Sequence, residues 1–94
     1  PENPKKAMEC YRDGAGKGYP QSQQNLGACY ISGYGVSQDP VQAWMWFSLA
    51  AAQGNEAAAK SRDAIQQEMK PAQLAEAKRL AAAFVPKPRN SGAN

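Results

Sequence analysis

The chain has 94 residues, which suits one small domain, and its net charge of +3 is mild. Hydrophobic residues make up 43 % of it, many of them alanine, and threonine is absent, so the composition favours closely packed helices over strands. No apolar run approaches the roughly 18 residues of a membrane span. Lysine and arginine are confined to residues 5–17 and 60–89, away from most aromatic residues. This separation argues against a nucleic-acid partner, because nucleic-acid-binding surfaces usually interleave the two.

The first predicted helix covers residues 4–17. Asn3 is a good N-cap, and Pro4 suits the first helical position because its missing N–H would have no partner there. Gly14 and Gly16 each weaken this helix by about 0.5–1 kcal/mol relative to alanine.

The stretch "GYGVSQDP" follows the second predicted helix, residues 21–32. A phosphate-binding Gly-x-Gly needs a preceding strand and a further glycine that opens a helix, and neither is present. The acidic Asp39 also stands at the next helix start, where an anion would have to bind. We therefore interpret Gly33 and Gly35 as turn residues with positive φ, and Val36 as an apolar anchor between the two helices.

The third predicted helix, residues 40–53, is apolar on two sides, which predicts that it lies between neighbouring helices. Small residues such as Gly27 permit close approach, and a large side chain there would overpack the contact at a cost of roughly 1–3 kcal/mol. Trp46 is expected to be packed or half-buried. Trp44 has two interpretations, an exposed anchor for a partner or a side chain that lies over the neighbouring helix.

Two further helices are predicted over residues 56–68 and 71–84, followed by a loose polar tail at 85–94. The last helix begins with Pro71 and is expected to close the stack, with its apolar residues facing inward. These inward residues are Leu74, Ala77, Ala81 and Phe84.

The chain contains an internal repeat. A shift of 36 residues aligns caps, first turns, small residues, aromatic residues and terminal glycines. The aligned pairs are Asn3 with Asp39, Pro4 with Pro40, Ala7 with Ala43, Tyr11 with Phe47, Ala15 with Ala51 and Gly18 with Gly54. Such repeated helix pairs bury their apolar faces only by stacking on one another.

The segment "QSQQNLGACYISGYGVSQDPVQAWMWFSLAAAQGN" resembles a Sel1-like repeat, a relative of the tetratricopeptide repeat. The matching positions are Leu26, Gly27, Tyr30, Gly33, Gly35, Val36, Asp39, Ala43, Trp46, Phe47, Ala50, Ala51 and Gly54. The resemblance implies an all-α fold, an α–α superhelix of antiparallel helix hairpins with about five helices. Within a domain at 1–84, it assigns a second helix of one repeat to 4–17, a full repeat to 21–54 and a divergent closing pair to 56–84.

By this resemblance the function is that of a non-catalytic scaffold, which binds a peptide or partner helix in a shallow concave groove. The first helix of each pair would line the groove, and the surface would be rich in amides and nearly uncharged. The candidate groove residues are Gln21, Gln24, Ala28, Ile31, Ser32, Ala57, Lys60, Ala64 and Gln67, with Trp44 as a further partner-binding candidate. The N-terminal side of the stack would be open, and we expect a longer parent chain or a second copy to cover it.

Cys10 and Cys29 are either a disulfide or two small packing residues. In a hairpin that turns near residues 19–20, they lie at the same height on antiparallel helices, and a bridge would add about 3 kcal/mol. A bridge would also favour an extracytoplasmic location, periplasmic or secreted, over the cytoplasm.

Catalysis is not expected, because the sequence has no histidine, no metal-ligand cluster and no nucleophile–base pair. No cofactor or metal is expected either. The alternative function is a structural or glycan-binding accessory domain of the cell envelope, with Trp44 and Tyr34 as the sugar contacts.

Overall fold

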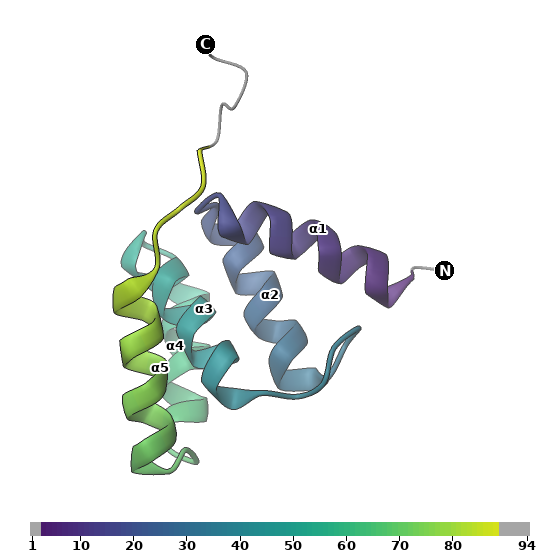
Figure 1. Ribbon diagram of the computed structural model, residues 1–94. Helices are drawn as coiled ribbons and strands as arrows, with labels where there is room; N and C mark the ends of the chain where they lie inside the picture. The colour runs from purple at the N-terminus through teal and green to yellow at the C-terminus, as the bar shows by residue number, and fades with distance from the viewer. Residues whose placement is uncertain (1–2, 89–94) are drawn as a thin grey trace.

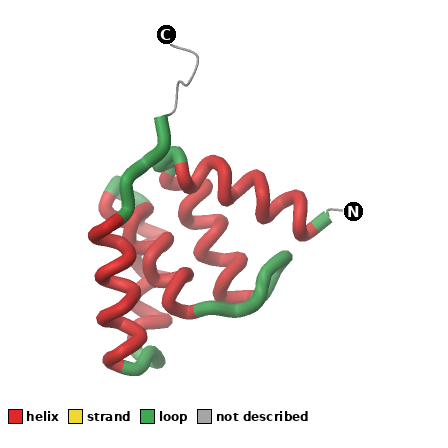
Figure 2. Tube along the Cα trace, in the orientation of Figure 1, coloured by secondary structure: helices red, strands yellow, loops and turns green. Residues whose placement is uncertain are grey.

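The structure is a computed structural model and describes residues 3–88. Within that range the chain forms helices and loops, without a strand (Figure 2). The helices are α1 (Pro4–Gly16), α2 (Pro20–Ser32), α3 (Pro40–Ala52), α4 (Glu56–Gln66) and α5 (Pro71–Ala83). Each lies within two residues of its predicted bounds, and the all-α prediction is confirmed.

The helices begin where local chemistry favours a start. Asn3 accepts a hydrogen bond from a first-turn N–H of α1 at 3.0 Å, and Asp39 accepts one at the start of α3 at 3.1 Å. Asn55 does the same for α4 at 2.9 Å. These side chains satisfy N–H groups that have no partner inside the helix, which fixes each entry point.

The helices stack as successive antiparallel pairs (Figure 1). The central helix is α3, which packs against α2, α4 and α5, while α1 packs against α2. Two buried clusters hold the stack together. The first is Met8, Ala15, Leu26 and Cys29, and the second is Ala43, Phe47, Ala50 and Ala58. Because each cluster draws on two or more helices, no single helix buries its apolar face alone.

At Gly27, α2 lies in close contact with the Phe47 side chain of α3. A Cβ atom placed on Gly27 would lie 2.8 Å from both Cδ1 and Cε1 of Phe47, whose side chain is 3 % exposed. The predicted close contact at this glycine is therefore confirmed.

The Gly-x-Gly segment is a turn, as predicted. Gly33 ends α2 with φ 79°, and its N–H donates to the Cys29 carbonyl at 2.8 Å. Gly35 also has positive φ, and its α-carbon faces the Pro4 carbonyl so closely that a side chain would not fit. Val36 packs against the first buried cluster. The turn thus ends one helix and also supports the start of α1.

After α5 the chain runs past the C-terminal end of α1 and contacts it (Figure 1), a contact that the expectation of a loose tail misses. The Phe84 ring packs edge-to-face on Trp46 with centroids 5.5 Å apart. The N–H of Lys87 donates to the Gly16 carbonyl at 2.8 Å. We call residues 84–87 the strap. Residues 89–94 of the predicted tail lie outside the described part of the chain.

Candidate functional site: a groove between α2 and α4

A hollow of about 460 Å³ lies between α2 and α4, the first helices of two successive pairs. We call it the α2–α4 groove. Its lining residues are Ala28, Ile31 and Ser32 of α2, Ser61, Ala64 and Ile65 of α4, and Phe47 of α3.

Helix periodicity explains how these side chains meet. On each wall the lining residues are spaced i, i+3 and i+4, which places them on one helix face. Phe47 of α3 completes the lining, and its ring also contacts Gly27 of α2. The two walls are therefore one face of α2 and one face of α4, and α3 supplies one further side chain.

The groove offers apolar contact and no charge among its lining residues. The Ser32 hydroxyl donates to the Ala28 carbonyl at 2.9 Å, so its donor is already used. A second hollow of about 390 Å³ shares Ile31, Ala64 and Ile65 with the groove and extends to Met69 and Glu68. Glu68 is the one charged residue on the lining of either hollow. Such a surface suits uncharged, apolar side chains of a ligand.

Four of the candidate groove residues meet in the groove: Ala28, Ile31, Ser32 and Ala64. The others do not line it. Gln21 donates to Gln24 at 3.2 Å, and Gln24 also accepts from Asn55 at 3.1 Å, so these amides are engaged within the protein. Ala57, Lys60 and Gln67 are exposed on or just after α4, away from the lining.

Trp44 is not an exposed anchor, and that interpretation is wrong. Its side chain is 8 % exposed, and its Nε1 donates to Gln66 at 2.9 Å. The alternative interpretation, packing against the neighbouring helix, is correct. A buried indole cannot stack on a sugar, so the glycan-binding alternative loses one of its two contacts. Trp46 is half-buried, as expected.

Sequence reasoning missed Phe47, Ser61 and Ile65 as groove residues. Phe47 and Ile65 are apolar residues of the kind expected in a core, and they do pack in or against the second cluster. Each also contributes to the lining of the groove. For Ser61 and Ile65 the available signal was their position beside Ala64 on α4. Phe47 lies on α3, and no local signal marked it.

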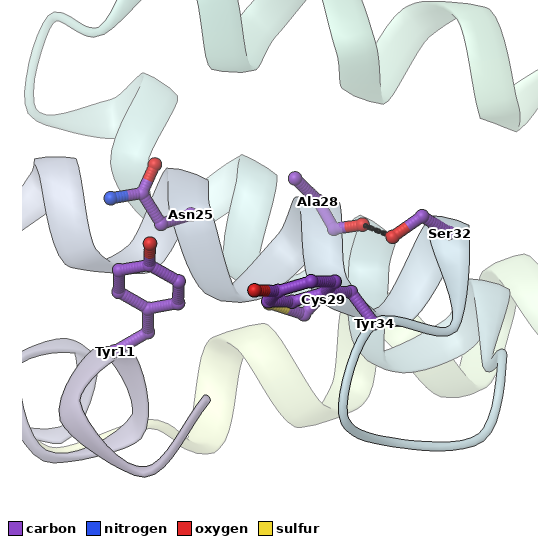
Figure 3. Close-up of a pocket in the computed structure, with 6 residues that line it drawn as sticks. All are labelled: Tyr11, Asn25, Ala28, Cys29, Ser32 and Tyr34. Carbon is purple, nitrogen blue, oxygen red and sulfur yellow. Dashed lines mark hydrogen bonds between the residues drawn. The ribbon is translucent and has the colours of Figure 1, made fainter. Parts of the chain in front are cut away.

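A third hollow, of about 350 Å³, lies between α1 and α2 (Figure 3). We call it the half-groove, since only two helices and a loop form it. Its lining residues are Tyr11, Asn25, Ala28, Cys29, Ser32 and Tyr34. Figure 3 shows the Tyr11 ring rising from α1 towards the helix that carries Asn25. The half-groove shares Ala28 and Ser32 with the α2–α4 groove, so the two hollows flank α2.

The two cysteines are free thiols in the structure, so the disulfide hypothesis is not supported. Cys10 is exposed on α1, whereas Cys29 is buried in the first cluster. Desolvation raises the pKa of the Cys29 thiol above its ordinary value, which keeps it protonated. Cys29 thus acts as a small packing residue, and the cysteines give no argument for a compartment.

Over residues 3–88, no cluster of histidine, cysteine, aspartate or glutamate has the size to hold a metal ion. In the same range, every helix is too short or too polar to cross a bilayer.

The comparisons with known proteins agree with this geometry. Residues 1–19 and 20–55 each match the Sel1 repeat. The chain belongs to the Sel1 repeat family. The second match contains α2 and α3, and the first contains α1 alone. The predicted family membership is confirmed.

A solved structure is also similar to this Sel1 repeat chain. It is described as the crystal structure of c5321, a protective antigen present in uropathogenic Escherichia coli strains, displaying an SLR fold. The two structures match with a TM-score of 0.85 and 30 % sequence identity. The match covers 87 % of this chain but only 18 % of the other chain. No curated protein sequence matches this chain. Sel1 repeats are in general protein–protein interaction modules and are typically non-catalytic.

Proposed function

We propose that this Sel1 repeat chain is a non-catalytic interaction module that binds a peptide or partner helix in the α2–α4 groove. The observation that carries the proposal is the composition of the groove. Ile31 on α2, Ile65 on α4 and Phe47 on α3 line the groove together, with no charged lining residue. An apolar side chain of a partner would lose its water shell between these groups, and that burial supplies the binding free energy.

The binding surface differs from the amide-rich one that the sequence suggests. Gln21 donates to Gln24, and Gln24 also accepts from Asn55, so both side chains already hydrogen-bond within the protein. Ile31 and Ala64 have no such competing interaction in the groove. Recognition should therefore depend on apolar complementarity and respond weakly to salt, because no charged lining residue needs screening.

The test is capture of partners from the source cells with the chain and two matched variants. Ala64→Glu places a charge on the wall of the groove, at an exposed position where the fold tolerates it. Ala75→Glu makes the same change at an exposed position on α5, outside the groove. We expect a specific partner to bind the chain and Ala75→Glu equally, and Ala64→Glu at least about tenfold more weakly.

Three results would contradict the proposal. A partner that binds Ala64→Glu as well as the parent chain uses another surface. A complex that dissociates between about 0.1 and 0.5 M salt is held by charge, not by the groove. Turnover of a small molecule by the purified chain, lost in a surface variant, would contradict the non-catalytic role.

A further inference from the structure

The α2–α4 groove continues into the second hollow. On the α4 side, Ser61 lines only the groove, whereas Glu68 and Met69 line only the second hollow. Ala64 and Ile65, which lie between them in the sequence, line both. The two hollows therefore follow one another along α4, and we call them together the extended groove.

The α2 side has the same order. Ala28 lines the groove but not the second hollow, whereas Ile31, about one turn later, lines both. Both α2 and α4 pack antiparallel to α3, so they run in the same direction (Figure 1). The second hollow therefore lies towards the C-terminal ends of α2 and α4, and the extended groove has two different ends.

The first end has room for a large apolar side chain. Ala28, Ser61 and Ala64 are small residues, and they line a space of about 460 Å³ together with the Phe47 ring. A leucine or phenylalanine side chain of a partner would lose its contact with water in this space, which favours binding. This end suits the apolar anchor of a bound segment.

The second end carries a negative charge. Glu68 is exposed and is the one charged lining residue of the extended groove. Lys70, two residues later, lines neither hollow. The ion pairs formed within residues 3–88 join Lys17 with Asp13, Arg62 with Asp63 and Arg79 with Glu76. Because Glu68 takes part in none of them, its carboxylate is available to a cation of a partner.

The spacing of the two ends sets a spacing on the partner. Glu68 follows Ala64 by four residues, which is roughly 6 Å at a helical rise of about 1.5 Å per residue. In an extended peptide, side chains on one face are two residues apart, which is also roughly 6–7 Å. In a partner helix, about four residues cover this length and return to the same face.

We infer that the segment bound in the extended groove carries a lysine or arginine at one defined position. The cation lies two residues from the large apolar side chain in an extended segment, or four residues from it in a helix. The apolar side chain occupies the groove, and the cation lies against the Glu68 carboxylate. This inference rests on the proposed function, because it specifies the partner of the same groove.

The preference is local and moderate. The net charge of +3 would by itself favour an acidic partner, so a basic residue in the bound segment is a property of this end of the groove alone. One exposed ion pair changes an affinity by roughly two- to fivefold. The preference therefore agrees with a complex that persists in salt, since apolar burial supplies most of its affinity.

The test selects peptides without assuming a natural partner. The probe is a library of short random peptides displayed on phage and selected on the full chain. Peptides that use the groove are identified with Ala64→Gln, which adds a bulky, uncharged side chain at an exposed lining position. The affinities of these peptides, fluorescently labelled, are then measured by polarisation for the chain and for Glu68→Gln and Glu68→Lys.

We expect peptides that are weakened by Ala64→Gln to contain a lysine or arginine at the inferred spacing. Glu68→Gln should weaken them by roughly two- to fivefold, and Glu68→Lys should weaken them further. The matched control is Glu56→Gln, at an exposed position of α4 outside both hollows, which should leave the affinity unchanged. A peptide whose lysine is replaced by glutamine should bind the chain and Glu68→Gln equally, which completes a double-mutant cycle.

The outcomes separate this inference from the proposed function. Peptides that are weakened by Ala64→Gln but lack the basic residue, or that bind Glu68→Gln as tightly as the chain, would overturn the inference and leave the proposed function standing. A selection in which no peptide is weakened by Ala64→Gln would contradict the proposed function, and the inference with it.

Discussion

Gly27→Ala tests whether the contact between α2 and α3 is as close as the structure shows. Alanine usually stabilises a helix interior by about 0.5–1 kcal/mol relative to glycine. Here the added Cβ would lie 2.8 Å from two ring atoms of Phe47 and 3.1 Å from a third. The ring is 3 % exposed and cannot move aside freely, so overpacking of about 1–3 kcal/mol opposes the gain. We expect net destabilisation of about 1–2 kcal/mol.

Urea denaturation followed by circular dichroism gives the free energy of unfolding for this comparison. The matched control is Gly16→Ala, also a helical glycine. The nearest atom to its added Cβ would be Cδ of Lys87 at 3.9 Å, so nothing needs to shift. This control should be neutral or stabilising by up to about 1 kcal/mol. A lower free energy of unfolding for Gly27→Ala and an equal or higher one for Gly16→Ala would separate the effect of packing from that of helix propensity.

The double variant Gly27→Ala, Phe47→Leu distinguishes the ring clash from other causes. Leucine is smaller than phenylalanine and leaves room for the added Cβ. Phe47→Leu should therefore lower the free energy of unfolding less in the Gly27→Ala background than in the parent chain. The reasoning is refuted if Gly27→Ala is as stable as Gly16→Ala. It is also refuted if the two substitutions are additive.

Three further predictions concern single side chains. Cys10 should react with a thiol reagent in the native state, whereas Cys29 should react only after unfolding or at high pH, because burial raises the pKa of its thiol and the thiolate is the reactive form. Mass spectrometry of labelled peptides checks the order of reaction. An intact protein two hydrogens lighter before reduction would contradict the prediction. Asp39→Ala should lower the free energy of unfolding by about 1 kcal/mol in urea denaturation, since two first-turn N–H groups of α3 lose their acceptor. Phe84→Ala should remove about 0.5–1.5 kcal/mol of aromatic packing and shift tryptophan fluorescence to longer wavelength, whereas Val85→Ala, at a side chain 80 % exposed, should change neither.

Local chemistry made the helices predictable. Proline at a first helical position and a capping side chain mark a helix start without reference to the rest of the fold, and Asp39 with Pro40 shows both. The turn at Gly33 and Gly35 was equally predictable, because glycine adopts positive φ at little cost and both residues have it. Each of these signals lies within a few residues of its effect.

The candidate site was only partly predictable, because it depends on contacts across the stack. Trp44 and Trp46 are two residues apart, yet one is buried with Gln66 and the other lies under Phe84. Helix periodicity places them on different faces but does not say which face meets a neighbour. The pairing of Gln24 with Asn55 joins residues 31 apart, and no local pattern predicts it.

The strap links parts of the stack that an ideal repeat array keeps separate. In a one-dimensional array each unit contacts only its neighbours, so the first helix frays independently of the last. Here α1 is intrinsically weak because it contains two glycines, but Lys87 bonds to its last residue and Phe84 covers Trp46 of α3. Unfolding of α1 must therefore break a contact made by the segment after α5. Cutting the chain after Phe84 should therefore speed hydrogen exchange in the last turn of α1 and leave the tryptophan fluorescence, which reports the Phe84–Trp46 contact, unchanged.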